Sequence, residues 1–285
     1  MQLEYLASLG LPVLSDKRLQ LVQDKEVQPT SGKLRETEST EVTRQNAVAA
    51  TRPLYMDGTY IFTCESTVLD VKAGEDGETV VVVLDETVFH PQGGGQPSDT
   101  GFLKASGLPD LQVVFVAKDK VVEGMIRHDC KGDVQAWLGK TGQRITCHVD
   151  ESRRRLSARL HSAGHLLDVA MLAVGFCWKP GKGYHFSDGP YVEYFPSQEG
   201  RQVDLKDVRA KELVMQELAD KMKELIAKNV ETQVAFVDGA RTVSMDGVSC
   251  GCGGTHVQFA GEIGEVTIKK LQAKQGNIRV SYAVS

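Results

Sequence analysis

The chain has 285 residues, of which 41% are hydrophobic and 25% are charged, so it has enough apolar material for a sizeable core and a length suited to two domains. With 33 Lys and Arg against 38 Asp and Glu the formal net charge is −5, which excludes a polyanion binder that relies on overall basic charge. No apolar run approaches the roughly 20 residues of a membrane-crossing helix. The N-terminal residues lack a basic start, so we expect neither secretion nor organelle import, and a cytoplasmic location.

Residues 1–54 are polar and lack a sustained helical or strand period, which predicts a partly flexible leader with a short helix over the first ten residues. Residues 55–149 predict a small β-barrel or β-sandwich domain, because short segments rich in β-branched residues alternate with Gly- and Asp-containing turns; of the two we expect the barrel. Three successive glycines predict a loop inside this domain. Its strands are expected at residues 60–73, 78–89, 111–118, 120–128 and 143–149.

Residues 150–285 predict a second domain of the α+β class, so the fold class of the whole chain is expected to be α+β. Asp150 can cap a helix that begins at Glu151 and keeps a helical period of apolar residues. A second amphipathic helix is predicted over residues 203–228. A Gly/Pro-rich loop is expected at 179–190 and a Gly/Cys-rich loop before the closing pair of strands. The strands are expected at residues 191–195, 232–237, 265–272 and 277–284.

Two pairs of side chains in this second domain have the spacing of metal ligands. His161 and His165 are four residues apart on the predicted helix, which places both imidazoles on one face. Because serine follows His161, the metalloprotease motif with its built-in glutamate base is excluded. Cys252 and His256 flank a short glycine-rich loop that can wrap around an ion. Cysteine and histidine ligands at a tetrahedral site favour Zn²⁺, so the four residues predict one zinc ion per chain.

The other cysteines have simpler interpretations. Cys250 is an alternative sulfur ligand, ranked second because two ligands of a C-x-C pair are cramped around one zinc ion. The remaining four are predicted to be separate packing residues, either small hydrophobic groups or partly buried thiols. They are Cys64, Cys130, Cys147 and Cys177.

The glycine loop is a third candidate for chemistry. Gly93, Gly94 and Gly95 allow backbone N–H groups to come close to a ligand, and Gln96 adds an amide. The loop is not a nucleotide-phosphate loop, because no Lys-Ser or Lys-Thr pair follows the glycines. A tight hairpin with no ligand is the alternative interpretation.

Three segments in this order resemble one family: TVFHPQGGGQPSDTG at 87–101, HSAGHLL at 161–167 and CGGTHV at 252–257. They resemble the editing half of alanyl-tRNA synthetase and, more closely, the free-standing alanyl-tRNA editing proteins of the AlaX family, whose zinc site is shared with the editing domain of threonyl-tRNA synthetase. The resemblance covers about residues 60–285 and implies the medium-length form of the family. It implies a zinc-dependent hydrolase that deacylates tRNA(Ala) mischarged chiefly with serine and secondarily with glycine, without a nucleotide triphosphate or a membrane partner.

The resemblance also implies roles for individual residues. The zinc ligands of the family match His161, His165, Cys252 and His256. Thr87 and Gln96, with the three glycines between them, match the motif that shapes the aminoacyl pocket. Ser162 stands where the family often has threonine, a change that keeps the hydroxyl group.

Contacts with tRNA must come from local basic clusters, since the chain is acidic overall. The first cluster begins the metal-binding helix and the second lies near the end of the chain; ordinary solvated surface charge is the alternative for both. The members of the first are Arg153, Arg154, Arg155 and Arg159, and those of the second are Lys269, Lys270, Lys274 and Arg279.

Several questions stay open at the level of sequence. Zinc could lower the pKa of a bound water, or it could only orient the ester while the terminal adenosine hydroxyl activates the water. No side chain is assigned as a general base. His185 and Glu193 are further polar candidates near the site, for which a structural role is the simpler interpretation. Two other function classes are a zinc-structured tRNA- or synthetase-binding module and a metal-dependent hydrolase of a small ester or amide.

Overall fold

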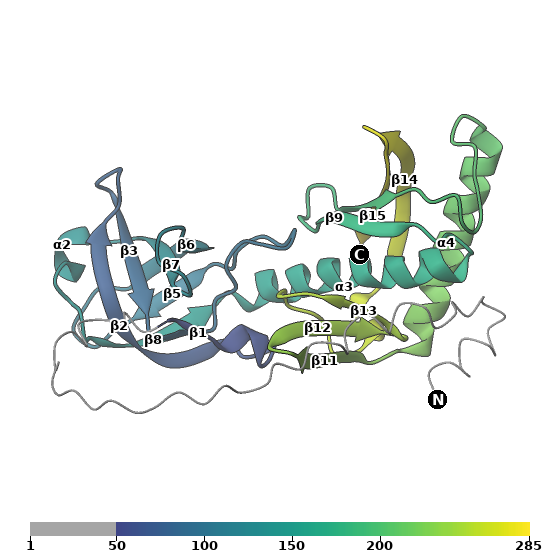
Figure 1. Cartoon of the computed structure of the whole chain (residues 1–285). Coiled ribbons are helices and arrows are strands. Elements are labelled where there is room, and N and C mark those ends of the chain that lie inside the picture. Colours follow the sequence, from purple (N-terminus) through teal and green to yellow (C-terminus); the bar gives the residue numbers. More distant parts are fainter. Residues whose placement is uncertain (1–49) are drawn as a thin grey trace, which may run out of the picture. The chain divides into compact units, whose positions relative to one another are not determined.

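A computed structural model describes residues 50–285, which fall within one compact unit. The leader and the short N-terminal helix expected from the sequence lie outside the described residues, apart from positions 50–54. Among the described residues no helix has the length and apolar character needed to cross a membrane. The described chain is rich in sheet and has a few helices, in agreement with the α+β class expected from the sequence (Figure 1).

Six antiparallel strands close into a barrel, which confirms the barrel predicted for this part of the chain. Alternate residues of each strand face the interior, where Val80, Val82, Leu103 and Val113 are fully buried. The short helix α2 (Val134–Trp137) adds a buried tryptophan to this core. In spatial order the strands are β2 (Thr63–Ala73), β3 (Thr79–Leu84), β7 (Ile126–Lys131), β6 (Leu111–Lys118), β5 (Gly101–Lys104) and β8 (Arg144–Val149).

Strand pairing beside the barrel begins earlier in the chain than the sequence suggested. Strand β1 (Arg52–Pro53) pairs in parallel with β4 (Glu86–Thr87), and the 3-10 helix η1 (Leu54–Met56) follows it. Thr51 is buried and its hydroxyl donates to the carbonyl of Leu84 at 2.8 Å. The sequence places these residues in the polar leader, because they are too few to show a strand period.

Three features of the barrel differ from the sequence-based expectation. Strand β5 lies outside all of the predicted strands, because four residues are too few to show a strand period. The strand predicted at 120–128 begins only at Ile126, because the Asp119 carboxylate accepts the N–H groups of Val121 and Val122 and forms a turn there. Cys64 and Cys147, expected to be separate, lie directly opposite each other on β2 and β8. Strand register, which no local pattern specifies for these two residues, brings them together.

The long helix α3 (Glu151–Ala173) begins where the sequence predicted. The Asp150 carboxylate accepts the N–H of Arg153 at 3.0 Å and caps the helix. The second long helix, α4 (Val208–Lys228), begins five residues later than expected because Asp207 is its cap. Val203 and Leu205, at the start of the predicted range, instead pack against the core from the segment that precedes the helix.

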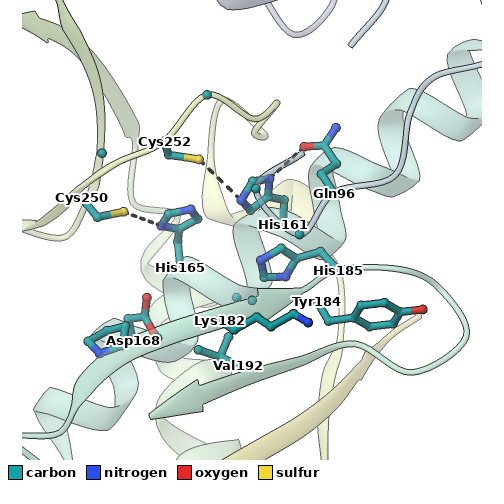
Figure 2. A pocket seen from close by; sticks show the side chains of 18 of the residues that line it. Gln96, His161, His165, Asp168, Lys182, Tyr184, His185, Val192, Cys250 and Cys252 are labelled. Atoms are coloured by element: carbon teal, nitrogen blue, oxygen red, sulfur yellow. Dashed lines mark hydrogen bonds between the residues drawn. The ribbon is translucent and has the colours of Figure 1, made fainter. Parts of the chain in front are cut away.

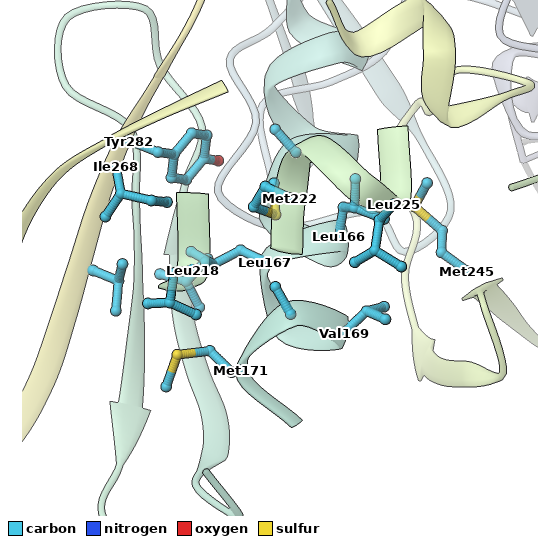
Figure 3. Close-up of a cluster of buried hydrophobic side chains, with 14 of the residues drawn as sticks. Leu166, Leu167, Val169, Met171, Leu218, Met222, Leu225, Met245, Ile268 and Tyr282 are labelled. Carbon is cyan, nitrogen blue, oxygen red and sulfur yellow. The ribbon is translucent and has the colours of Figure 1, made fainter. Parts of the chain in front are cut away.

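The two helices pack together and share one apolar core (Figure 3). Leu166, Leu167 and Val169 of α3 and Leu218 and Met222 of α4 are buried there. Leu166 and Val169 are three residues apart and Leu218 and Met222 are four apart, spacings that keep each pair on one side of its helix. Side chains from both neighbouring sheets, including Met245, Ile268 and Tyr282, complete the core.

Two small antiparallel sheets lie on either side of α3 (Figure 1). The strands predicted at 191–195, 232–237 and 277–284 are present, and the one predicted at 265–272 begins one residue later and ends two residues later. The four-stranded sheet has the order β14 (Val266–Lys274), β15 (Asn277–Val284), β10 (Tyr191–Phe195) and β9 (Lys179–Tyr184). The three-stranded sheet has the order β11 (Thr232–Val237), β12 (Ala240–Met245) and β13 (Val248–Gly251).

Three segments expected to be loops, β9, β12 and β13, are strands, and two of them lie at the edges of their sheets. The glycine- and proline-containing segment β9 pairs with β10, and the serine–cysteine segment β13 pairs with β12. Neither has the β-branched composition of a strand, because each is an edge strand whose neighbour supplies the backbone partners. Both line the pocket described below, so their assignment matters for function.

A buried ion pair fixes the start of α3 to the barrel. The guanidinium of Arg154 donates to the Asp99 carboxylate, with Nε 3.0 Å from Oδ2, and also to the carbonyls of Thr59 and Val88. Both charged side chains are almost completely buried, with exposures of 0% and 1%. Asp99 also accepts the N–H of His90, so the segment that carries the glycine loop is held by the same carboxylate.

Candidate metal centre and substrate pocket

Four side chains far apart in the sequence converge at one point. His161, His165, Cys252 and His256 each bring a ligand atom, and these atoms all lie within 4.8 Å of one another. Helix α3 supplies the first two from adjacent turns, and the loop after β13 supplies the other two. The Nε2 atoms of His161 and His256 lie 3.5 and 3.2 Å from the Cys252 sulfur. The structure therefore brings together all four predicted ligands.

The glycine loop reaches this group through Gln96. Its Oε1 accepts the Nδ1–H of His161 at 2.8 Å and the N–H of Thr255 at 3.0 Å, while its Nε2 donates to the Thr255 hydroxyl at 2.8 Å. The two contacts with Thr255 fix the orientation of the amide. Nδ1 of His161 must then carry the proton, so Nε2 is left with a lone pair directed at the group (Figure 2).

Other contacts orient the remaining ligands. The Ser162 hydroxyl lies 3.3 Å from Nδ1 of His256 and also accepts the N–H of Val257. The Cys250 sulfur lies 3.1 Å from Nδ1 of His165. Cys250 itself is outside the group of four, so the structure places it behind a ligand rather than in the ligand set.

The electrostatics of the group suit a cation. Burial lowers the pKa of His161 and His256 well below the ordinary histidine value, and it lowers the pKa of His165 to about 4, so all three imidazoles are neutral with free lone pairs. Burial raises the pKa of the Cys252 thiol in the absence of a cation. A metal ion would reverse that shift, because it stabilises the thiolate directly.

Close backbone packing explains two of the glycines. A side chain at Gly254 would place its Cβ 2.2 Å from the His161 ring, so only glycine allows the loop to close over the histidine. Gly95 has a positive φ of 80°, and a Cβ there would lie 2.4 Å from the carbonyl oxygen of Gly183 on β9. The glycine loop is thus docked against β9, where the Gly95 carbonyl also accepts the N–H of His185 at 2.8 Å.

The group opens on a pocket of about 950 Å³. The glycine loop, the face of α3, strand β9 and strand β13 form its walls. Of the residues predicted to bind substrate, Gly93, Gly94, Gly95 and Gln96 line it.

Thr87, also predicted to bind substrate, does not line the pocket. Its side chain is fully buried inside the barrel, 2.8 Å from Nε2 of His128, and it accepts the N–H of Phe89 at 3.1 Å.

His185 also lines this pocket, and its protonation follows from its contacts. The Tyr282 hydroxyl donates to the carbonyl of Leu160 at 2.8 Å, so it can only accept from Nδ1 of His185, 2.7 Å away. Burial lowers the pKa of His185 to about 3, which leaves Nε2 unprotonated. The ring stacks on His161 with centroids 4.4 Å apart, so it also supports a predicted ligand.

The predicted basic clusters fall in several environments. Arg154 has no exposed surface with which to contact a phosphate. Arg153 is exposed and donates to the carbonyl of Ser98, while Arg155 pairs with Glu151 and lies 4.7 Å from the centroid of an aromatic ring. Arg159 donates to backbone carbonyls. Arg279 forms an ion pair with the other polar candidate, Glu193.

The lysines of the second cluster are all exposed. Lys269 and Lys270 are consecutive, yet both face solvent because the register of β14 shifts between Ile268 and Lys270. Such an irregularity inserts one extra residue and turns two neighbours to the same side. Lys274 lies at the end of the same strand.

Three charged residues of the pocket were not identified from the sequence. Lys179 and Lys182 of β9 line the pocket, as does Asp168 of α3. The lysines belong to a segment expected to be a loop, so their facing direction could not be derived. Asp168 could have been found, because it follows His165 by three residues on a helix whose ligand face was already predicted.

Comparison with known proteins gives a consistent result. The family described as tRNA synthetases class II (A) matches residues 15–153. The alanine–tRNA ligases of Korarchaeum cryptofilum and Halobacterium salinarum are 30% and 29% identical over 250 and 262 residues, in each case 82% of this chain. The chain spans about a quarter of the length of these ligases, 26% in both.

A relative of similar size defines the family. The alanyl-tRNA editing protein AlaX-M of Methanosarcina acetivorans is 31% identical over 224 residues, which cover 70% of this chain and 87% of that protein. The glycine loop of the barrel and the His/Cys group that it contacts thus occur in a chain that is related in sequence to the alanine–tRNA ligases. The chain belongs to the AlaX family of alanyl-tRNA editing proteins.

Proposed function

We propose that the protein is a zinc-dependent trans-editing hydrolase that deacylates mischarged tRNA(Ala), chiefly Ser-tRNA(Ala) and secondarily Gly-tRNA(Ala). Family membership supports the substrate class. The structural observation that carries the proposal is the convergence of His161, His165, Cys252 and His256 at the wall of a pocket bounded by the glycine loop. One Zn²⁺ ion per chain would be held by these four residues.

The donor set fits that ion in type and in protonation. Three neutral imidazoles and one thiol are soft to borderline ligands, which favour zinc over hard cations such as Mg²⁺. Gln96 and Ser162 bond the outer nitrogens of two of the histidines, an arrangement common behind zinc ligands. When bound, the ion polarises an ester carbonyl or lowers the pKa of a bound water toward about 7.

The chain's own residues have the remaining tasks. Aminoacyl-tRNA is an activated ester, so the protein must position water and stabilise the oxyanion that develops on the carbonyl. Water adds to the ester carbon, the bond to the terminal ribose oxygen breaks, and that oxygen takes a proton, which yields free amino acid and tRNA. Gln96 holds the His161 imidazole in place, and Gly95 packs the loop against β9 so that the pocket keeps its width.

A separate editing site is needed because a single binding pocket discriminates poorly between amino acids of similar size. An alanine pocket cannot strongly exclude glycine, which lacks one methylene, or serine, which adds one hydroxyl. A polar editing pocket can favour the seryl ester, because alanine would leave its hydrogen-bonding groups unpaired at about 1–3 kcal/mol. We therefore propose that Ala-tRNA(Ala) is largely spared.

Binding of the tRNA acceptor end must use local charge. Lys179 and Lys182 at the pocket are suited to the phosphates next to the aminoacyl ester, and Lys269, Lys270 and Lys274 to phosphates farther along the acceptor stem. Arg153 and Arg155 at the start of α3 are exposed enough to take part. Arg154 takes no part because it is buried.

Multiple-turnover deacylation of Ser-tRNA(Ala), Gly-tRNA(Ala) and Ala-tRNA(Ala) tests the proposal. We expect catalytic turnover of the first two and little of the third, together with loss of turnover in Cys252→Ala. Binding of all three without turnover would instead identify a zinc-structured binding module. Equal activity on simple seryl esters would identify a general esterase.

A further inference from the structure

One wall of the pocket contains a carboxylate that the metal centre does not use. Asp168 lines the pocket three residues after His165, on the same face of α3 (Figure 2). Its Oδ1 accepts the hydroxyl hydrogen of Tyr194 at 2.7 Å. Among residues 50–285 no Lys, Arg or His forms an ion pair with Asp168.

This carboxylate is unfavourable for the protein alone. Asp168 is half-buried, so its carboxylate loses part of its hydration, and one hydroxyl donor replaces only some of it. Burial accordingly raises the pKa of Asp168 to about 7. The neighbouring core of α3 is formed by Leu166, Leu167 and Met171, so an apolar residue at this position would be compatible with its surroundings.

A second, independent group in the lining of the same pocket is also without a polar partner. Trp178 also lines the pocket, and its side chain is only 4% exposed. Its indole N–H is buried and has no hydrogen-bond partner in the part of the chain that the structure describes. The lining of the pocket therefore includes a carboxylate without a cationic partner and a residue whose N–H donor is unsatisfied, a combination that suits a ligand with a cationic group and an oxygen atom.

We propose that Asp168 binds the α-ammonium group of the aminoacyl ester and so restricts the pocket to esters with a free amino group. This inference rests on the proposed function. In such an ester one carbon atom separates the ammonium nitrogen from the carbonyl carbon. Residues three apart on a helix have Cβ atoms about 5–6 Å apart, so a carbonyl held beside His165 has its ammonium within reach of Asp168. Peptidyl or N-acylated tRNA lacks that charge and would be rejected.

The test compares two esters of one tRNA. Ser-tRNA(Ala) is compared with the product of its nitrous acid deamination, in which a hydroxyl group replaces the α-ammonium. We expect wild-type protein to prefer the seryl ester at least tenfold in kcat/KM. Asp168→Asn keeps the size of the side chain and removes its charge, so we expect about a 10–100-fold loss on the seryl ester and less than a threefold change on the deaminated ester.

Controls separate a binding role from a structural one. Asp220→Asn removes the same charge from an exposed site on α4 and should leave both esters unchanged. Tyr194→Phe removes the donor to Asp168 but keeps the carboxylate, so it should retain the preference for the seryl ester. Zinc content and the thermal unfolding midpoint, measured for every variant, verify that each remains folded and metal-bound.

The outcomes distinguish the two proposals. Equal losses on both esters in Asp168→Asn, or an unchanged preference, would overturn the role of Asp168 while leaving the hydrolase intact. Failure of the wild-type protein to hydrolyse either ester would instead contradict the proposed function. The inference requires that Asp168→Asn lose the preference for the seryl ester over the deaminated ester, while Asp220→Asn and Tyr194→Phe keep it.

Discussion

Gln96 on the barrel loop accepts the Nδ1–H of His161 on α3 at 2.8 Å, so a residue of the barrel sets the tautomer of a metal-ligand candidate 65 positions later. The amide cannot rotate freely, because both of its ends also bond Thr255. This contact makes the glycine loop part of the support for the metal site as well as a wall of the pocket.

Gln96→Ala is therefore expected to weaken zinc binding about 10–100-fold, since outer partners of histidine ligands typically contribute that much. Competition with a chromophoric chelator measures the affinity directly. Gln112→Ala, which truncates an exposed glutamine on β6 of the barrel, is the matched control and should bind zinc like the wild type. Unaltered affinity in Gln96→Ala would show that the contact does not support the metal site.

Thr87→Val should destabilise the barrel by about 1–3 kcal/mol, because it leaves the N–H of Phe89 and the His128 ring nitrogen without their partner. Since Thr87 does not line the pocket, the ratio of seryl to alanyl ester hydrolysis should stay constant. Urea unfolding and single-turnover deacylation of both esters measure the two effects. A selective loss of serine discrimination would return Thr87 to the substrate-binding group.

His128 predicts a pH dependence of stability. Burial lowers its folded-state pKa to about 4, below the unfolded value of 6.5, so the stability linked to its neutral form is present above pH 6.5 and is lost as the pH falls toward 4. The full loss is about 3 kcal/mol at 1.36 kcal/mol per pH unit. Urea unfolding between pH 4.5 and 8 should show a shallower decline in His128→Gln than in the wild type. Parallel curves for the two proteins would contradict this assignment.

The buried pair of Arg154 and Asp99 should be costly to break from one side. Arg154→Met leaves an uncompensated buried carboxylate and is expected to lower the free energy of unfolding by about 3–5 kcal/mol. Adding Asp99→Leu should recover part of that loss, because the second charge is then removed as well. Chemical denaturation of the single and double variants measures the coupling, and strictly additive losses would argue against a mutual interaction.

The exposed lysines of β14 predict a change in salt dependence. Lys269→Ala together with Lys270→Ala should lower the log–log slope of tRNA affinity against salt by about 0.7–0.9 for each phosphate that these lysines neutralise. Zinc content should not change. Lys221→Ala, which removes a lysine already paired with Glu224 on α4, is the control and should keep the wild-type slope. If the double variant and the wild type share one slope, the tRNA-binding face lies elsewhere.

Much of the fold and of the candidate site follows from local pattern. Asp150 and the apolar period after it predict the start of α3, and the alternation of β-branched residues predicts the barrel. The pairs His161–His165 and Cys252–His256 are each read from spacing, because a helical turn and a short loop fix neighbouring side chains on the same side. The two pairs are combined because their donor types together complete a tetrahedral zinc site, and the family resemblance supports that combination.

Only the tertiary structure decided the rest, because those outcomes depend on partners distant in the chain. Strands β9 and β13 exist through pairing with β10 and β12, although neither has a strand-like composition. Arg154 belongs to an arginine run that suggested phosphate contacts, yet packing against the barrel buries it with Asp99. Thr87 and Gln96 share one motif, but Thr87 is buried beside His128 of β7, whereas Gln96 bonds His161 of α3.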